Sequence, residues 1–143
     1  MSGIFLIVWD DKPDEFLKPT KGGWPHITIG YSGKNLCKEN LVHLSQSVFE
    51  EFALEEITLD RLYINSFTTS KGVTRHDVLA MVSEKDSKDL QKARESLDEN
   101  EFDFKDLHVT LGIHPTLESA QAHLEQAKLM LPRKVTITGV TID

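Results

Sequence analysis

Two short segments of this 143-residue chain share one order of residue types. Residues 26–30 read His-Ile-Thr-Ile-Gly, and residues 108–112 read His-Val-Thr-Leu-Gly. In both, a histidine and a threonine alternate with branched aliphatic residues. Side chains on a β-strand point alternately to its two faces. If each segment is a strand, an imidazole and a hydroxyl share one face, and the aliphatic side chains occupy the other.

Two such polar faces turned toward each other would surround a small anion with two imidazoles and two hydroxyls. This set suits the cleavage of a phosphodiester without a metal ion. A neutral histidine accepts a proton from the attacking water or hydroxyl, and a protonated histidine donates one to the departing oxygen. The ordinary pKa of histidine, about 6.5, keeps both forms accessible near neutrality. Threonine hydroxyls donate hydrogen bonds to the non-bridging phosphate oxygens.

The elements that position these segments follow from the hydrophobic periodicity of the chain. Apolar alternation and β-branched or aromatic runs predict strands at 3–9, 26–31, 56–66, 76–83, 107–113 and 134–142. Apolar residues spaced by three and four predict helices at 38–53, at 87–98 and from an N-cap at Thr116 to Leu131. Residues 10–24, with two prolines and two glycines, predict a loop.

A shift in the apolar parity between Leu59 and Leu62 predicts a β-bulge near Asp60–Arg61. The predicted order is ββαββαβαβ, with a hairpin formed by 56–66 and 76–83. Strand–helix alternation combined with a hairpin predicts an α+β fold, mostly antiparallel, with the helices outside. The whole chain, 1–143, fits one domain.

The composition restricts the classes of function. Hydrophobic residues make up 39% and charged residues 27%, as in ordinary soluble proteins. No apolar run approaches the roughly 20 residues that cross a bilayer, and 3–9 is too short for a signal-peptide core. Cys37 is the single cysteine, which excludes an internal disulfide and favours a cytoplasmic location. A net charge of −7 disfavours binding to long duplex nucleic acid and is compatible with a small nucleotide or RNA-end partner. We also expect a monomer.

Three aromatic residues near the two segments, Trp9, Trp24 and Tyr31, are candidates for stacking on a base. Core packing or loop anchoring explains each of them nearly as well. Basic residues in the predicted loops could add positive charge, although solvated side chains are the usual case; they are Lys21, Lys34, Lys71 and Arg75.

The remaining histidines have weaker claims. His43 and His123 lie off the apolar stripes of their predicted helices, which indicates solvated surface positions. His76 begins a predicted strand and is expected at a rim. His114 shares the parity of His108 and would border the same face, but Pro115 opposes continuation of that strand. Neither an HExxH string nor a cysteine cluster accompanies these residues, so no metal site is predicted.

The paired His-x-Thr-x strings resemble those of the two-histidine (2H) phosphoesterase superfamily. That superfamily includes the bacterial RNA 2′,3′-cyclic phosphodiesterases of the LigT kind, plant and yeast cyclic phosphodiesterases and viral 2′,5′-phosphodiesterases. Its members commonly place the two motifs about 80 residues apart, and His26 and His108 are 82 positions apart. The resemblance covers nearly the whole chain, and the two short motifs are its specific part.

The resemblance implies that His26 and His108 are the catalytic pair, that Thr28 and Thr110 bind phosphate, and that no cofactor is needed. It also implies two pseudo-symmetric lobes of mostly antiparallel sheet, flanked by helices, around a central cleft. The expected activity is hydrolysis of a 2′,3′-cyclic phosphate, a 2′,5′-linked oligonucleotide or a cyclic nucleotide. We assign His108 as the base and His26 as the acid, although pseudo-symmetry permits the reverse.

The sequence departs from the LigT pattern at one point. An arginine often follows the second glycine there, whereas Ile113 and His114 follow Gly112 here. Two alternatives also stay open. One is a phosphodiesterase for cyclic dinucleotide or oligonucleotide signals, and the other is a catalytically silent module that binds nucleotides or RNA ends in the same groove.

Overall fold

The computed structural model describes residues 2–12 and 14–143, so Met1 and Pro13, the latter within the expected loop 10–24, lie outside it. The strands are β1 (Ser2–Trp9), β2 (His26–Ser32), β3 (Glu56–Thr68), β4 (Thr74–Val82), β5 (His108–His114) and β6 (Arg133–Ile142). The helices are α1 (Lys38–Phe52), α2 (Glu84–Arg94) and α3 (Leu117–Lys128). The predicted order of strands and helices and the α+β class are confirmed.

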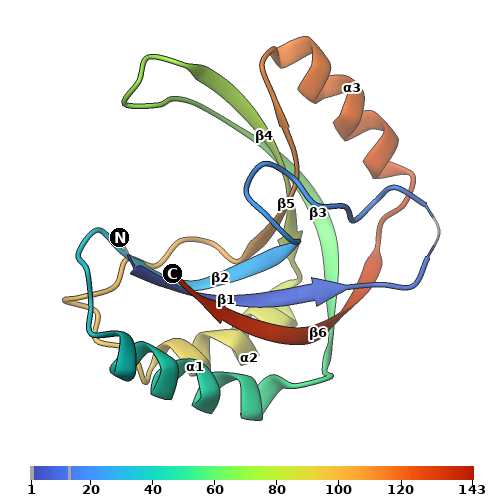
Figure 1. Ribbon diagram of the computed structural model, residues 1–143. Helices are drawn as coiled ribbons and strands as arrows, with labels where there is room; N and C mark the ends of the chain where they lie inside the picture. The colour runs from blue at the N-terminus through green and yellow to red at the C-terminus, as the bar shows by residue number, and fades with distance from the viewer. Residues whose placement is uncertain (1, 13) are drawn as a thin grey trace.

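Within the described residues the strands form one antiparallel sheet, in the order β1-β2-β5-β4-β3-β6, which closes into a ring (Figure 1). β3 and β4 form the long hairpin that arches over the molecule. β6 pairs with β1 along one edge and with β3 along the other. The ring closes on its opposite side where β2 meets β5 through the pair Ile27↔Val109.

The hydrophobic core lies between the sheet and the helices. Alternate strand residues such as Ile4, Leu6 and Ile137 are fully buried, as period-two patterning requires. Helix α1 packs on β1 and β6, α2 on β2, and α3 on β3, β4 and β5; Figure 1 shows α1 and α2 on the β1–β2–β6 side and α3 on the other. The opposite face of the strands is therefore free to line cavities. Among the described residues, no helix has the length and apolar character needed to cross a membrane.

Several local predictions can be compared with the structure. The bulge in β3 is confirmed, because the register with β4 shifts between Leu59 and Arg61. Thr116 is confirmed as the N-cap of α3, since its hydroxyl accepts a hydrogen bond from the Ser119 N–H at 3.1 Å. Helix α3 ends at Lys128 instead of reaching Leu131, because a residue before proline disfavours helical backbone.

The predicted helix 87–98 is wrong in its boundaries, since α2 covers Glu84–Arg94. Ser83 caps this helix by accepting a hydrogen bond from the Asp86 N–H at 3.3 Å. A serine N-cap satisfies one of the N–H groups that lack a partner in the first turn. The helix therefore begins directly after β4. The two hairpin strands are also longer at the turn than predicted, because β3 continues to Thr68 and β4 begins at Thr74.

Candidate active site

The two motif strands meet at their first aliphatic residues. Ile27 of β2 lies opposite Val109 of β5 in an antiparallel pair. Continuing that register by one residue in each direction places His26 across from Thr110 and Thr28 across from His108. Side chains that are directly opposite in an antiparallel pair are close neighbours. Each imidazole therefore lies near the hydroxyl of the other motif.

Both catalytic candidates are anchored in the same way. The Nδ1 atom of His26 lies 2.7 Å from the carbonyl oxygen of Trp24, and Nδ1 of His108 lies 2.7 Å from the carbonyl oxygen of Asp106. A carbonyl only accepts hydrogen bonds, so Nδ1 carries the hydrogen in both rings. Nε2 is then the nitrogen that gains or loses a proton. The backbone thus holds each ring in the tautomer that general acid–base catalysis needs.

Each motif strand carries a bulge at the same position. In β2, Phe5 of the neighbouring strand pairs with Thr28 while Ile4 pairs with Gly30, which leaves Ile29 as the extra residue. In β5 the register with β4 skips Leu111 in the same way. A bulge bends the strand and changes the face to which later side chains point. The histidine and threonine thus stay on one face of the sheet while the following glycine turns toward the helices.

The two motif glycines sit where other groups approach the backbone closely. A Cβ at Gly30 would lie 2.9 Å from Cδ1 of Leu97 and 3.0 Å from Cδ1 of Phe102. A Cβ at Gly112 would lie 2.6 Å from the ring of His123. Both distances are shorter than carbon contacts in packed interiors, about 3.5–4.0 Å. The glycines are therefore required by packing behind the motif strands.

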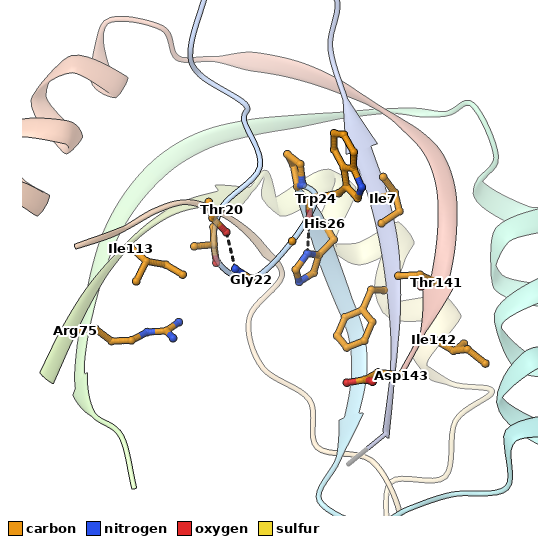
Figure 2. Close-up of a pocket in the computed structure, with 14 residues that line it drawn as sticks. Ile7, Thr20, Gly22, Trp24, His26, Arg75, Ile113, Thr141, Ile142 and Asp143 are labelled. Atoms are coloured by element: carbon orange, nitrogen blue, oxygen red, sulfur yellow. Dashed lines mark hydrogen bonds between the residues drawn. The ribbon is translucent and has the colours of Figure 1, made fainter. Parts of the chain in front are cut away.

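Two cavities meet at the motif strands. The first, of about 500 Å³, is lined by His26 and Thr110 together with Trp24; Figure 2 shows the His26 ring and the Trp24 side chain at its wall. The second, of about 840 Å³, is lined by Thr28, His108 and Thr110. Thr110 therefore lines both, as do Phe5 and Arg75. We call the two neighbouring cavities together the groove.

Arg75 is the cation that both parts of the groove share. Its Nε and Nη2 atoms donate to the two carboxylate oxygens of Asp77 at 3.0 and 2.7 Å, and its guanidinium lies 4.8 Å from the centre of the Phe67 ring. The prediction that Arg75 belongs to a loop is wrong, because it lies in β4. Its extended backbone directs the side chain across the groove, opposite His26 (Figure 2).

A buried arginine connects the first motif to the segment before the second. Arg94, at the end of α2, donates from Nε to the Ile29 carbonyl at 2.8 Å and from Nη2 to the Lys105 carbonyl at 2.6 Å. A longer bond of 3.3 Å reaches the Thr28 carbonyl. Burial lowers the pKa of Arg94, and the nearby Asp106 partly opposes this effect. The sequence analysis missed this residue, although its spacing of four from Leu90 places it on the apolar stripe of the helix.

The three aromatic candidates lie in different places. Trp24, which is 62% exposed, lines the groove beside His26. Tyr31 lines the part of the groove that contains His108. Trp9 lies outside the groove lining and borders a separate cavity of about 710 Å³. Its ring meets that of Trp24 edge-on, with 6.2 Å between the centroids. Trp24 and Tyr31 are therefore the two aromatic candidates in contact with the groove.

Two other histidines form an unexpected pair. Nε2 of His114 lies 2.9 Å from Nδ1 of His123, so the prediction that His123 is a solvated surface residue is wrong. The bulge at Leu111 turns His114 away from the groove lining and toward α3. His76 interacts with the Ser66 hydroxyl at 2.6 Å. Within the described residues, no group of three or more histidine, cysteine or acidic side chains is arranged to hold a metal.

Protein-family profiles give no match to this chain, and no curated protein sequence matches it either.

Proposed function

We propose that the chain is a metal-independent phosphodiesterase of the two-histidine type. The observation that carries this proposal is the equivalent anchoring of His26 and His108 on strands that pair at Ile27↔Val109. Two imidazoles with their Nδ1 atoms bound to backbone carbonyls offer two Nε2 atoms for proton transfer at one centre. General acid–base catalysis requires such a pair, one member neutral and the other protonated.

In the proposed reaction, a nucleophilic water or hydroxyl attacks phosphorus while Nε2 of His108 accepts its proton. The bond from phosphorus to the leaving oxygen breaks, and Nε2 of His26 donates a proton to that oxygen. One proton is taken up and one released, so the two histidines exchange protonation states and are reset through solvent. The hydroxyls of Thr28 and Thr110 donate hydrogen bonds to the non-bridging oxygens, whose negative charge grows in the transition state.

Arg75 is suited to balance the charge of the bound phosphate. It lines the same cavity as Ile113, which stands where LigT-type sequences often have an arginine. An arginine guanidinium binds phosphate oxygens through a fork of N–H groups. Asp77 holds that fork by two hydrogen bonds, so the cation is oriented before the substrate arrives. We therefore infer that β4 supplies the cation that the second motif lacks.

Repeated features of the two motif strands support the two-lobed arrangement of the 2H superfamily. Each strand has the same histidine anchor, a bulge at the fourth motif position and a glycine that faces tight packing. Two lobes built alike, meeting at Ile27↔Val109, would account for all three repeats. We propose that the groove along that junction is the central cleft of such an arrangement.

The dimensions of the groove suit a small nucleotide substrate. Its two parts measure about 500 and 840 Å³, within the range of roughly 300–1,000 Å³ typical of ligand sites. Trp24 borders one part and Tyr31 the other, and aromatic faces stack on bases of any sequence. We therefore propose a 2′,3′-cyclic phosphate, a 2′,5′-linked oligonucleotide or a cyclic nucleotide as the substrate.

Turnover of a 2′,3′-cyclic nucleotide and a 2′,5′-linked dinucleotide in the presence of EDTA tests the proposal. We expect His26→Ala and His108→Ala each to lower kcat by about 10²–10⁴-fold, the usual contribution of a general acid or base. His43→Ala is the matched control, because His43 is exposed on α1. Nucleotide binding without turnover would indicate the silent module instead, and loss of turnover in EDTA would indicate a metal enzyme.

The pH profile assigns the two roles. A base must be deprotonated, so activity rises with pH through its titration, and an acid causes the fall at higher pH. If His108 is the base, the rising limb disappears from the residual activity of His108→Ala and persists in His26→Ala. The opposite result would exchange the two assignments and leave the proposed reaction unchanged.

A further inference from the structure

A smaller cavity of about 230 Å³ lies beside the groove, and we call it the cationic pocket. Lys18, Lys21 and His123 line it, together with Thr20 and Ile113. The last two residues also line the part of the groove that contains His26. A molecule bound in the groove can therefore extend into the cationic pocket past Thr20, which Figure 2 shows at the groove wall.

The pocket is positively charged in a protein whose net charge is −7. Among the described residues that line it, none carries a carboxylate. Lys18 has one ion pair, with Glu15 at 3.9 Å, and the two side chains are 52% and 87% exposed. Exposed pairs of this kind contribute little to stability, so Lys18 can exchange Glu15 for an anionic ligand. The lysines and the histidine therefore make the lining of the pocket locally basic.

The histidine pair gives the pocket a proton-linked donor. His114 uses Nδ1 to bond the Ser119 hydroxyl at 2.5 Å and Nε2 to bond Nδ1 of His123. Among the described residues, Nε2 of His123 has no hydrogen-bond partner, and His123 lines the pocket. Burial, the proximity of His114 and the charge of Lys18 all lower the pKa of His123. An anion in the pocket would offset these charges and favour the protonated, hydrogen-bond-donating ring.

The size of the pocket limits the ligand. A volume of about 230 Å³ is below the roughly 300–1,000 Å³ of sites for drug-sized molecules, and it suits a tetrahedral anion. Two ammonium groups, a threonine hydroxyl and an imidazolium are all donors, and phosphate oxygens are acceptors. A neutral sugar or base would leave these charges without a partner.

We propose that the cationic pocket binds a phosphate group of the substrate other than the one that is cleaved. The preferred substrate then carries a terminal phosphate in addition to its phosphodiester. The identity of the bound molecule rests on the proposed function, whereas the phosphate site itself does not. Free inorganic phosphate has the same chemistry, so the test separates the two sources.

The first measurement is a titration of the full chain with inorganic phosphate, followed through the ring C–H signals of His114 and His123 by NMR. We expect saturable shifts of both rings, and affinity that rises as the pH falls because His123 takes up a proton. The charged groups that act on the pair are Lys18 and Asp77, and Lys21 lines the same pocket. Absence of saturable shifts would overturn the proposal.

The matched variants keep the fold and change the charge. Lys18→Gln combined with Lys21→Gln alters only an exposed loop, and we expect about a twofold to thirtyfold loss of phosphate affinity, the range for two exposed charge interactions. Lys34→Gln combined with Lys71→Gln removes the same charge from exposed positions outside the pocket lining. Equal affinity in both double variants would show a nonspecific charge effect and overturn the site.

The second measurement compares kcat/KM for two oligonucleotides that differ only by a terminal phosphate. We expect the phosphorylated substrate to be preferred through a lower KM, and the preference to disappear in the Lys18→Gln, Lys21→Gln variant. Equal turnover of both substrates by the unmodified chain would overturn the assignment to substrate and leave free phosphate as the ligand. No turnover of either would contradict the proposed function alone, because the titration reads the phosphate site directly.

Discussion

Arg94→Met removes the guanidinium that joins the first motif to the segment before the second. In the folded chain, Nε and Nη2 of Arg94 donate to the Ile29 and Lys105 carbonyls at 2.8 and 2.6 Å. Methionine fills a similar volume but has no donor. The carbonyl at the β2 bulge and the carbonyl of Lys105 would then lose their charged partner inside the protein, where only 6% of Arg94 is exposed.

The magnitude follows from the two short hydrogen bonds. A hydrogen bond to a charged group contributes about 1.5–3 kcal/mol, so two give about 3–6 kcal/mol. Burial disfavours the charged guanidinium, as the direction of the Arg94 pKa shift shows, and methionine avoids that cost. We therefore expect the free energy of unfolding to fall by about 2–4 kcal/mol, a large part of the 5–15 kcal/mol typical of a domain.

Urea denaturation followed by circular dichroism measures this loss. Arg61→Met is the matched control, because Arg61 also donates to a backbone carbonyl, that of Val82 at 3.0 Å, but its side chain is 61% exposed. We expect the control to change stability by less than about 0.5 kcal/mol, as for ordinary surface substitutions. If Arg94→Met were as mild as the control, the inference that Arg94 links the two motifs would be wrong.

The same variant also tests the proposed reaction, because Lys105 precedes Asp106, whose carbonyl anchors His108. Loosening that segment is expected to lower kcat by displacing His108. KM is also expected to rise, because Arg94→Met removes the bonds to the Thr28 and Ile29 carbonyls in the first motif. Arg94→Lys supplies one donor group instead of a fork, so it should restore part of the stability and part of kcat. Recovery of stability without recovery of kcat would contradict the coupling to His108.

Two further predictions concern stability. Hydrogen bonding from Arg133 lowers the pKa of Asp14. This interaction therefore stabilises the folded state fully at pH values above the ordinary carboxyl pKa of about 3.9, and the stabilisation is lost as the pH falls from there through the lowered pKa. In urea titrations, the difference in unfolding free energy between the unmodified chain and Asp14→Asn should shrink below about pH 4. Gly112→Ala places a Cβ 2.6 Å from the His123 ring and should cost about 1–3 kcal/mol by overpacking, whereas Gly33→Ala, with no atom within 4 Å of the added Cβ, should be close to neutral by thermal denaturation.

Local patterns were sufficient to predict the order of elements. The alternation in 26–31 and 107–113 reports which face of each strand is buried, and the burial of Ile27 and Val109 agrees with it. The parity shift near Asp60–Arg61 also predicted the β3 bulge correctly. These features depend on residues that are close together in the chain. Because strand side chains alternate between the two faces, the order of apolar and polar residues indicates them directly.

The parts that the sequence did not reveal depend on contacts between distant residues. The bulges at Ile29 and Leu111 leave the hydrophobic alternation before them intact, so no parity signal marks them. The bond from Arg94 to the Ile29 carbonyl spans 65 positions. The His114–His123 pair forms only because α3 packs on β5. That packing half-buries His123, although its place on the polar side of the predicted helix indicated exposure to solvent.

The position of β6 in the sheet determines when the ring of strands can close during synthesis. It pairs with β1 and with β3, and both partners are translated before it. Until Arg133–Ile142 emerges from the ribosome, β1 and β3 are unpaired edge strands, because β6 is the strand that joins them in the sheet order. The ring should therefore close in one step, when β6 docks between β1 and β3.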